Sequence, residues 1–417
     1  MSRDQVRATR RFRPASLDAL NFLLSDVRGA LGPYLNVFLV TQQQWSQSTV
    51  GLVTALSGWL SLAMQTPIGA AIDTTPRKRE AIVVTLAVLA VGAVGLFVAP
   101  RFWPVLTANA AMAVVGDVLA PAVAGLTLGL VQSQALARRL GRNAAFDHAG
   151  NVAIAAVAGA VGWLFSQRAV FLLAPVCAVL AAAAALSIPA AAIDARRARG
   201  AQEGQEGEST PAVASPRVLL ACRPLVIFGG CMLLFHSANA PLLPLVGQKL
   251  AFAHPTWATA MMSACIIAAQ LVMMPLAVLV GRTADTWGRK PLLLVGFGIL
   301  PIRAVLYTVS NASAWLVGVQ LLDGVGVGIG DALTPLLVAD LMRGTGRYNL
   351  ALGAVATMKG VGAATSGLVA GLIVDHFGYA AAFLTSGAVA TVALAVLVLA
   401  MPETAPAREV ASLRQAR

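Results

Sequence analysis

The ten residues 281–290 read GRTADTWGRK and lie between two apolar segments, residues 257–280 and 292–309. An α-helix needs roughly 20 mainly apolar residues to cross the hydrocarbon core of a bilayer. Charged side chains are unfavourable in that core. We therefore interpret residues 281–290 as a loop at a membrane surface that joins two transmembrane helices.

The composition of the whole chain agrees with a bilayer as its solvent. Of its 417 residues, 58% are hydrophobic and only 12% are charged, and the mean hydropathy is +0.77. Soluble domains carry about 25% charged residues. The cysteines lack metal-ligand spacing, so we interpret them as small buried side chains rather than as disulfides. They are Cys177, Cys222, Cys231 and Cys265.

Twelve segments are apolar and long enough to form transmembrane helices. Because backbone polar groups cannot stay unpaired against lipid, each is expected to be helical, or broken only where it is buried. The predicted segments are residues 17–40, 50–72, 81–98, 105–131, 144–165, 169–188, 225–245, 257–280, 292–309, 315–341, 350–374 and 380–400.

A charged stretch, residues 191–216, separates the sixth segment from the seventh. It mixes arginines and glutamates with Gly, Ser and Pro, which is typical of a solvated linker. We predict an N-terminal six-helix bundle over residues 1–190, a cytoplasmic linker over 191–222, a C-terminal six-helix bundle over 223–403 and a cytoplasmic tail over 404–417.

The basic residues favour one orientation in the membrane. With the N-terminus inside, 24 of the 30 Lys and Arg residues are cytoplasmic, and only Arg101, Arg168 and Lys249 are outside. This bias predicts an even number of helices with both termini cytoplasmic. It also explains the net charge of +12 without a nucleic-acid partner.

The N-terminus is basic, and the first apolar segment is too long for the core of a cleavable signal peptide, so we expect none. The abundance of Ala and Arg is typical of bacterial proteins with GC-rich genes. We therefore expect a multi-pass protein of the bacterial inner membrane.

Three short patterns recur between the two halves of the chain, in the same order. The offset is 212 residues from Gly69-x-x-x-Asp73 to Gly281-x-x-x-Asp285, 214 from Gly116-Asp117 to Gly330-Asp331, and 205 from Gly141-Arg142 to Gly346-Arg347. A duplicated six-helix unit is typical of secondary transporters, whose binding site lies between the repeats. The predicted fold class is an all-α membrane protein with 12 transmembrane helices in two pseudo-symmetric six-helix bundles.

With these residues the chain resembles the major facilitator superfamily over nearly its whole length. Residues 281–290 match the family's loop signature G-x-x-x-D-x-x-G-R-K/R in full. The first copy keeps Gly69, Asp73 and Arg77, but Thr74-Thr75-Pro76 interrupts the glycine position. The resemblance implies that the halves rock to alternate access. It also implies a cytoplasmic gating set of Gly69, Asp73, Arg77, Gly281, Asp285, Gly288, Arg289 and Lys290.

The resemblance departs from the multidrug–proton antiporters of the family at two points. Their fifth helix carries a Gly-Pro motif, whereas residues 158–163 read AGAVGW. An arginine that is usual in their fourth helix is also absent. Both departures argue against multidrug transport.

Ionisable side chains within a membrane are functional-site hypotheses, because a bilayer disfavours their charge. The family resemblance implies that the first, fourth, seventh and tenth helices line the central cavity. The proton-coupling or substrate candidates are Asp26, Arg28, Asp117, His236, Asn239, Arg303, Gln320, Asp323, Asp331 and Lys359.

The tenth segment has the clearest geometry among these candidates. At 100° per residue, Asp323 and Asp331 lie about 60° and 20° from Gln320, on opposite sides of it, so the three form one polar stripe. Asp26 and Arg28 are about 200° apart and cannot share a face. Static pairing of an aspartate with Arg303 is the alternative to a direct role in transport.

Several roles stay open. His236 can carry a proton near neutral pH or act as a packing residue. Arg303 and Lys359 can neutralise carboxylates, which we favour, or bind an anionic substrate. Residues 143, 147 and 151, spaced by four on the fifth segment, form either a hydrogen-bond cluster or substrate contacts.

Sequence motifs for other functions are missing. We find no ATP-binding G-x-x-x-x-G-K-[ST] loop, zinc-ligand spacing or G-x-S-x-G element. We expect no cofactor, no metal and no enzymatic activity. The expected partners are a small-molecule substrate, protons and the lipid bilayer, with the chain acting as a monomer.

We predict a proton-coupled secondary transporter that exports a small organic solute. Proton-coupled uptake of an organic anion is the first alternative, with Arg28, Arg303 and Lys359 as ligands. An uncoupled facilitator or a transporter-like sensor is the second.

Overall fold

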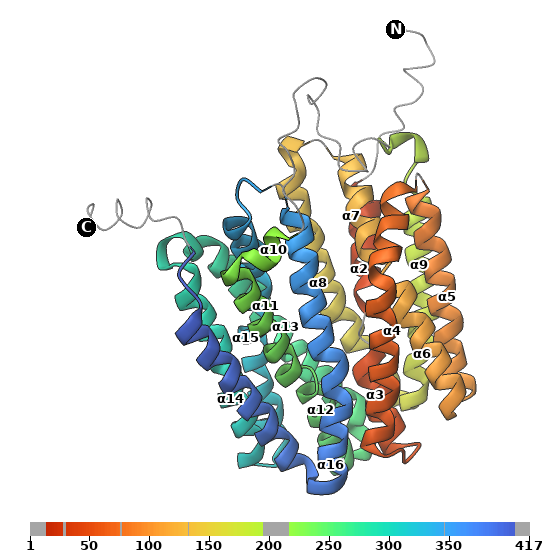
Figure 1. Ribbon diagram of the computed structural model, residues 1–417. Coiled ribbons are helices and arrows are strands. Elements are labelled where there is room, and N and C mark those ends of the chain that lie inside the picture. The colour runs from red at the N-terminus through yellow and green to blue at the C-terminus, as the bar shows by residue number, and fades with distance from the viewer. Residues whose placement is uncertain are drawn as a thin grey trace. The chain divides into compact units, whose positions relative to one another are not determined.

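The computed structural model describes residues 14–27, 31–75, 77–131, 133–194, 217–345 and 347–404 (Figure 1). Within these ranges the regular secondary structure is helical, without strands. The side chains of residues 26, 27, 31, 73, 74, 133, 134 and 137 lie outside the description.

The described residues of the first half form eight α-helices and two short 3-10 turns. They are α2 (Pro14–Val27), α3 (Leu31–Thr41), α4 (Gln47–Thr74), α5 (Lys78–Val98), α6 (Phe102–Gly116), α7 (Leu119–Leu130), α8 (Ser133–Leu164), η1 (Gln167–Leu172), α9 (Leu173–Leu186) and η2 (Ala190–Ala192). The predicted segment 105–131 is therefore split into α6 and α7, with turn residues 117 and 118 between them.

The second half repeats this plan. Its elements are α10 (Val218–Ala221), α11 (Arg223–Asn239), α12 (Leu242–Ala253), η4 (Pro255–Trp257), α13 (Ala258–Trp287), α14 (Arg289–Val309), α15 (Ser313–Leu341) and α16 (Tyr348–Ala400). Gly378 has non-helical angles, φ 81° and ψ 172°, and divides α16 into the last two predicted helices.

Nine helical segments in the described ranges are long and apolar enough to cross a membrane, and α16 counts once among them although it contains two helices. The predicted first segment corresponds to α2 and α3, which are 14 and 11 residues long. The predicted second segment is α4, whose 28 residues include Ser57, Ser61 and Gln65. These account for the twelve helices of the prediction.

Helices extend beyond several predicted segments. For example, α8 begins at Ser133 instead of at residue 144, so the polar turns that contain Arg139 and Arg142 are also helical. Hydropathy marks where an apolar environment begins, whereas the backbone continues its hydrogen bonds into the polar region.

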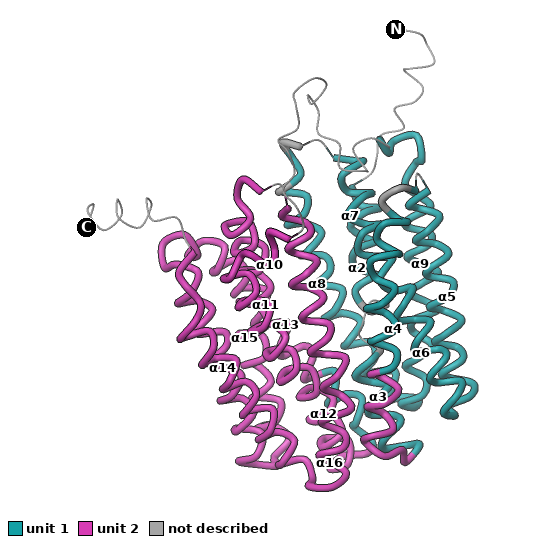
Figure 2. The backbone as a smooth tube through the Cα atoms, viewed as in Figure 1, with its two compact units in different colours: residues 1–43, 56–208, 256–263 teal, residues 44–55, 209–255, 264–417 magenta. Residues whose placement is uncertain are grey.

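The chain forms two compact units (Figure 2). Unit 1 comprises Met1–Gln43, Leu56–Glu208 and Thr256–Ser263, and unit 2 comprises Gln44–Ala55, Ser209–Pro255 and Ala264–Arg417. In unit 1, α2 packs against α8 and α9, and α5 against α6 and α9. Leu20, Leu86 and Leu126 are fully or almost fully buried in its core.

In unit 2, α11 lies along α16, and α14 packs on α15 and α16. Glycines bring these elements close together. A Cβ at Gly326 of α15 would lie 3.2 Å from the carbonyl oxygen of Gly296 in α14. Such small-residue contacts allow close helix packing where lipid provides no hydrophobic driving force.

Candidate functional site

A buried polar cluster joins α11, α14 and α15 within unit 2. Arg303 of α14 is only 1% exposed and forms an ion pair with Asp323 of α15. Its Nη1 donates to Asn239 Oδ1 at 2.7 Å, and its Nε donates to the Tyr307 hydroxyl at 3.1 Å. A buried arginine is tolerated in this way, because its charge is paired and its protons find acceptors.

The cluster is closed by Gln320, one of the polar stripe residues predicted on α15. The Tyr307 hydroxyl donates to Gln320 Oε1, and Gln320 Nε2 donates to Asp323 Oδ2 at 2.9 Å. One buried donor is left over: Arg303 Nη2 has no hydrogen-bond partner among the described residues. An unsatisfied buried donor is unfavourable, so this nitrogen favours binding an acceptor atom.

The second ion pair, Asp331–Lys359, has a different environment. Lys359 Nζ lies 2.8 Å from Asp331 Oδ1, across α15 and α16. The Asp331 side chain is 55% exposed, whereas that of Asp323 is mostly buried. The Asp331 side chain therefore lies largely at the surface of unit 2, whereas Asp323 is enclosed by protein.

His236 lies on α11 three residues before Asn239, so the two side chains are on the same face of that helix. The His236 Nδ1 is 3.1 Å from the carbonyl oxygen of Met232, one turn earlier on the same helix. The structure thus joins four of the predicted candidates in one cluster, Asn239, Arg303, Gln320 and Asp323, and two more, Asp331 and Lys359, in a separate ion pair of unit 2.

Asp117 belongs to unit 1 and lies at the break between α6 and α7. Ser61 of α4 donates to Asp117 Oδ2 at 2.6 Å. Its counterpart by sequence repeat, Asp331, lies inside the continuous helix α15. Asp26 is within α2, but its side chain is outside the description, and Arg28 lies outside the described residues.

Residues 281–290, predicted as a loop, are helical except at Gly288, because α13 continues to Trp287 and α14 begins at Arg289; they form a network in unit 2. Gly288, with φ 92°, turns the chain between α13 and α14, a conformation that suits a residue without Cβ. The buried Arg289 pairs with Asp285 at 2.6 Å and with Asp340 at 3.1 Å. The Glu403 carboxylate accepts the backbone N–H groups of Arg289 and Lys290, at 2.9 and 3.0 Å.

The structure also describes the surroundings of Lys290 and Gly281, two further residues of the signature 281–290. Lys290 Nζ donates to the Val398 carbonyl at 2.9 Å. Gly281 lies within α13, and a Cβ there would meet nothing within 4 Å. Gly281 therefore has no steric requirement for glycine in this conformation.

The first copy of the loop, in unit 1, is built differently. Gly69 lies in α4 without a close neighbour, and the Asp73 side chain lies outside the description. The Arg77 side chain is exposed, while its backbone N–H donates to Thr75 Oγ1 at 3.2 Å. Lys78 is buried instead and donates to the Ile72 carbonyl at 2.6 Å.

The family-model comparison identifies this architecture. The model of the major facilitator superfamily matches residues 17–299 and 259–416. The chain belongs to the major facilitator superfamily. It is a transporter of that family, with the all-α fold of twelve transmembrane helices in two six-helix bundles.

Relatives within the superfamily carry transporter names. Two strains of Mycobacterium tuberculosis have a relative named "Uncharacterized MFS-type transporter". This relative is 46% identical to the chain over 389 residues, which cover 93% of this chain and 93% of the relative. A second M. tuberculosis MFS-type transporter is 28% identical over 159 residues, which cover 37% of this chain and 26% of that protein.

Solved structures share the superfamily fold at low identity. The nucleoside transporter NupG matches with a TM-score of 0.73 at 13% identity, covering 92% of this chain and 98% of that chain. A D-xylose–proton symporter matches with a TM-score of 0.70 at 14% identity, covering 94% and 97%.

A buried ionic cluster in unit 1 was not predicted from the sequence. Asp18 of α2 accepts hydrogen bonds from Arg139 and Arg142 of α8, each with an Nη2 to oxygen distance of 2.7 Å. Arg139 Nε also donates to Asn143 Oδ1 at 2.8 Å, and Asn143 Nδ2 to Thr127 Oγ1 at 3.0 Å. The sequence signal that could have indicated this cluster is an acidic residue, Asp18, near the start of the first apolar segment.

A second unpredicted contact in unit 2 involves Asp375 of α16. Its two carboxylate oxygens accept the backbone N–H groups of Gln47 and Ser48, at 3.0 and 2.8 Å. The carboxylate therefore caps the first turn of α4, where helical N–H groups lack intrahelical partners. Gln47 Nε2 also donates to the Tyr379 hydroxyl at 2.8 Å.

Among the residues predicted at the start of the fifth segment, Asn151 Nδ2 donates to the Asp147 backbone carbonyl at 3.1 Å. Asn143 belongs to the Asp18 cluster described above. In the described part of the chain, no group of three or more His, Cys, Asp or Glu residues could hold a metal ion. The four cysteines are free thiols.

Proposed function

We propose that this superfamily transporter exports a small organic solute in exchange for protons. It does so by alternating access of the N-terminal bundle, residues 1–190, and the C-terminal bundle, residues 223–403. The linker 191–222, the tail 404–417 and both termini lie on the cytoplasmic side of a bacterial inner membrane. One chain suffices for transport, without a cofactor or enzymatic activity.

The observation that carries proton coupling is the ion pair between Lys359 and the exposed carboxylate of Asp331. Charged residues are rare in membrane-spanning helices, where they pair with one another and mark the paths of substrates, ions or protons. A proton that binds the 55% exposed Asp331 removes its attraction for Lys359. The pair therefore has two protonation-dependent arrangements, which a proton gradient can populate differently.

We assign the buried pair Arg303–Asp323 a positioning role, since its hydrogen bonds hold three helices together. The network around Asp285, Arg289, Asp340 and Glu403 forms the cytoplasmic gate of the second half. Asp117 and His236 are further proton-binding candidates. Asp26 and Arg28 stay in the proposal on sequence grounds.

The proposal is tested by proton flux in proteoliposomes with an imposed pH gradient and a panel of organic acids, amines and metal chelates. Asp331→Asn is expected to reduce solute-dependent proton flux at least tenfold. The free energy of unfolding of this variant is expected to change by about 1 kcal/mol or less, because the Asp331 side chain that is altered is itself 55% exposed. Glu80→Gln, which neutralises an exposed carboxylate paired with Arg79, is the matched control.

Unaltered proton flux in Asp331→Asn would contradict coupling at this pair. Solute movement without any proton flux would identify a facilitator. Solute driven inward together with protons would reverse the proposed direction.

Uptake of an organic anion is the second candidate function. It is favoured by Arg303 Nη2, a buried cationic donor without a partner among the described residues. A carboxylate or phosphate oxygen of a substrate would satisfy that donor. Inward accumulation of an acid from the panel, lost in Arg303→Lys, would favour this function over export.

Asp375 supplies a further prediction about the transport cycle. We propose that its cap on α4 is a latch between the outer ends of the second and eleventh helices, which opens in the outward-facing state. Asp375→Ala is expected to destabilise the latched state by about 1 kcal/mol, the usual effect of losing a helix cap. The substitution Asp375→Asn keeps one acceptor oxygen and should have a smaller effect.

Double electron–electron resonance, which measures the distance between spin labels at residues 46 and 376, tests this prediction. The population with a long distance is expected to rise from wild type to Asp375→Asn and further to Asp375→Ala. Identical distance distributions in all three proteins would show that the cap does not control the contact.

A further inference from the structure

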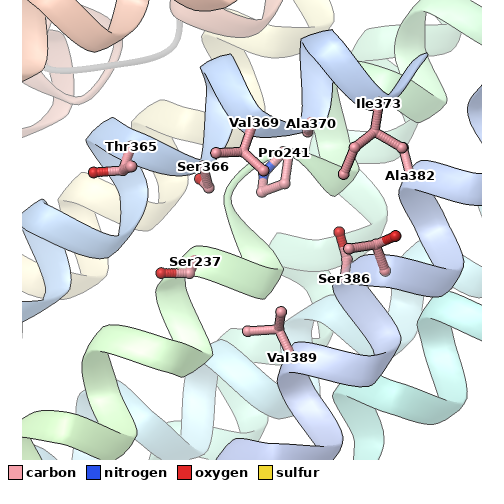
Figure 3. A pocket seen from close by; sticks show the side chains of 11 residues that line it. Ser237, Pro241, Thr365, Ser366, Val369, Ala370, Ile373, Ala382, Ser386 and Val389 are labelled. Carbon is pink, nitrogen blue, oxygen red and sulfur yellow. The ribbon is translucent and has the colours of Figure 1, made fainter. Parts of the chain in front are cut away.

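A cavity lies in unit 2, beside the break between α11 and α12 and between the two parts of α16 (Figure 3). Its volume is about 130 Å³, and none of its lining residues is charged. An engineered cavity of about 150 Å³ in another protein holds benzene. The cavity in unit 2 is therefore large enough for a single six-membered ring.

Three of the five hydroxyl side chains that line the cavity already donate their protons to backbone carbonyls, so they offer acceptor oxygens. Ser237 Oγ donates to the Leu233 carbonyl at 2.8 Å, and Ser366 Oγ donates to the Ala363 carbonyl at 2.9 Å. Each hydroxyl has one proton and two lone pairs, so its oxygen remains an acceptor after this donation. Thr365 makes the same type of bond to Val361, at 2.9 Å.

Pro241 adds another acceptor. Proline has no backbone N–H, so the carbonyl of Ser237, four residues earlier, receives no helical hydrogen bond from position 241. Both residues line the cavity; in Figure 3 Ser237 lies on the green helix α11 and Pro241 at the break after it, while Ser366 and Ser386 come from the blue α16. The apolar part of the wall includes Val369, Ile373 and Val389.

We propose that this cavity binds an uncharged, ring-sized solute, or the ring of a larger solute, that presents O–H or N–H donors. The hydroxyl and carbonyl oxygens accept these protons, and the valine and isoleucine side chains pack against the ring. Charged molecules are excluded, because the lining offers no counter-ion and desolvation of a charge is unfavourable. As a subsite for the transported solute, the cavity rests on the proposed transport function.

The position of the cavity favours a part in transport. Ser237 and Pro241 flank Asn239, which accepts a hydrogen bond from Arg303 at 2.7 Å. A solute held against the helix break therefore contacts the same turn that anchors the buried cluster. Breaks of this kind are places where helices bend.

The test is a binding measurement that does not depend on transport. Purified protein in lipid nanodiscs is titrated with cyclohexanol, its methyl ether and cyclohexylammonium, and saturation-transfer NMR records the bound fraction. Cyclohexanol is expected to bind saturably and at least fivefold more tightly than the ether, which lacks the donor. Cyclohexylammonium should bind at least as weakly as the ether.

Two matched substitutions locate the signal. Val389→Phe fills the cavity and should abolish saturable binding, whereas Val392→Phe, at a 53% exposed position three residues further on, should leave it unchanged. Ser366→Ala removes one acceptor and should weaken cyclohexanol binding about fivefold. A melting curve followed by ultraviolet circular dichroism confirms that each variant is folded.

Equal binding of the alcohol and the ether would overturn the proposal, because the cavity would then suit an apolar occupant such as a lipid acyl chain. Binding that persists in Val389→Phe would overturn it too, since the probe would be in the bilayer. Saturable, variant-dependent binding without proton-coupled flux would retain the binding site and reject only the proposed coupling.

Discussion

Asp323→Asn is expected to destabilise unit 2 by about 3–5 kcal/mol, because it leaves Arg303 charged and buried without its counter-ion. Arg303 is 1% exposed, so water cannot replace the lost carboxylate. The amide can still accept one hydrogen bond but carries no charge. Chemical or thermal unfolding in detergent, followed by tryptophan fluorescence, measures the loss, and transport is expected to fall with the folded fraction.

A double variant separates stability from function at the same site. Arg303→Met with Asp323→Leu removes both charges, and such apolar replacements of buried pairs are often neutral or stabilising. We expect it to recover most of the stability. If transport stays absent in the stable double variant, the pair also serves the transport cycle.

Asp331→Asn on the same helix is the control for the effect of burial. Its carboxylate is 55% exposed, so its loss should change stability by about 1 kcal/mol or less. Equal destabilisation by Asp323→Asn and Asp331→Asn would contradict the assignment of a positioning role to the buried pair alone.

The sequence predicted the fold well because transmembrane helices are specified by local composition. The apolar run of each span is a property of consecutive residues, and the lipid requires those residues to be helical. Helix ends were less predictable. The early start of α8 at Ser133 depends on Arg139 being buried against Asp18, which is distant in the chain.

The site was predicted less completely, since its partners come from different helices. The polar stripe on α15 followed from helical periodicity, and Gln320 does contact Asp323. Periodicity could not show that Asp323 pairs with Arg303 whereas Asp331 pairs with Lys359, because that choice depends on how α14 and α16 pack.

The charged residues near helix ends are the main structural contacts that the sequence analysis did not predict. Such positions are favourable for solvated charge, so they carry little information when only the sequence is considered. In the structure Asp375 binds the backbone of α4, and Asp18 is buried between arginines. Tertiary packing gives both carboxylates specific partners, although only Asp18 is buried and Asp375 stays exposed.

Asp18→Ala is expected to have a comparably large effect in unit 1. Asp18 is 4% exposed, and it neutralises the buried Arg139, so its loss leaves that arginine unpaired. The expected destabilisation is about 3–5 kcal/mol. Folded, monodisperse protein should decrease in size-exclusion chromatography, and the unfolding midpoint in detergent should fall.

The second arginine of this cluster provides the control. The Arg142 side chain is 55% exposed, so Arg142→Ala removes a largely solvated partner and should destabilise unit 1 by about 1 kcal/mol or less. Arg139→Met in the Asp18→Ala background removes the unpaired charge and should recover part of the lost stability. If Asp18→Ala and Arg142→Ala were equally mild, the Asp18–Arg139 pair would contribute little to holding α8 against α2. If Arg139→Met failed to improve Asp18→Ala, the loss would come from the missing hydrogen bonds between Asp18 and the two arginines, and not from an uncompensated charge.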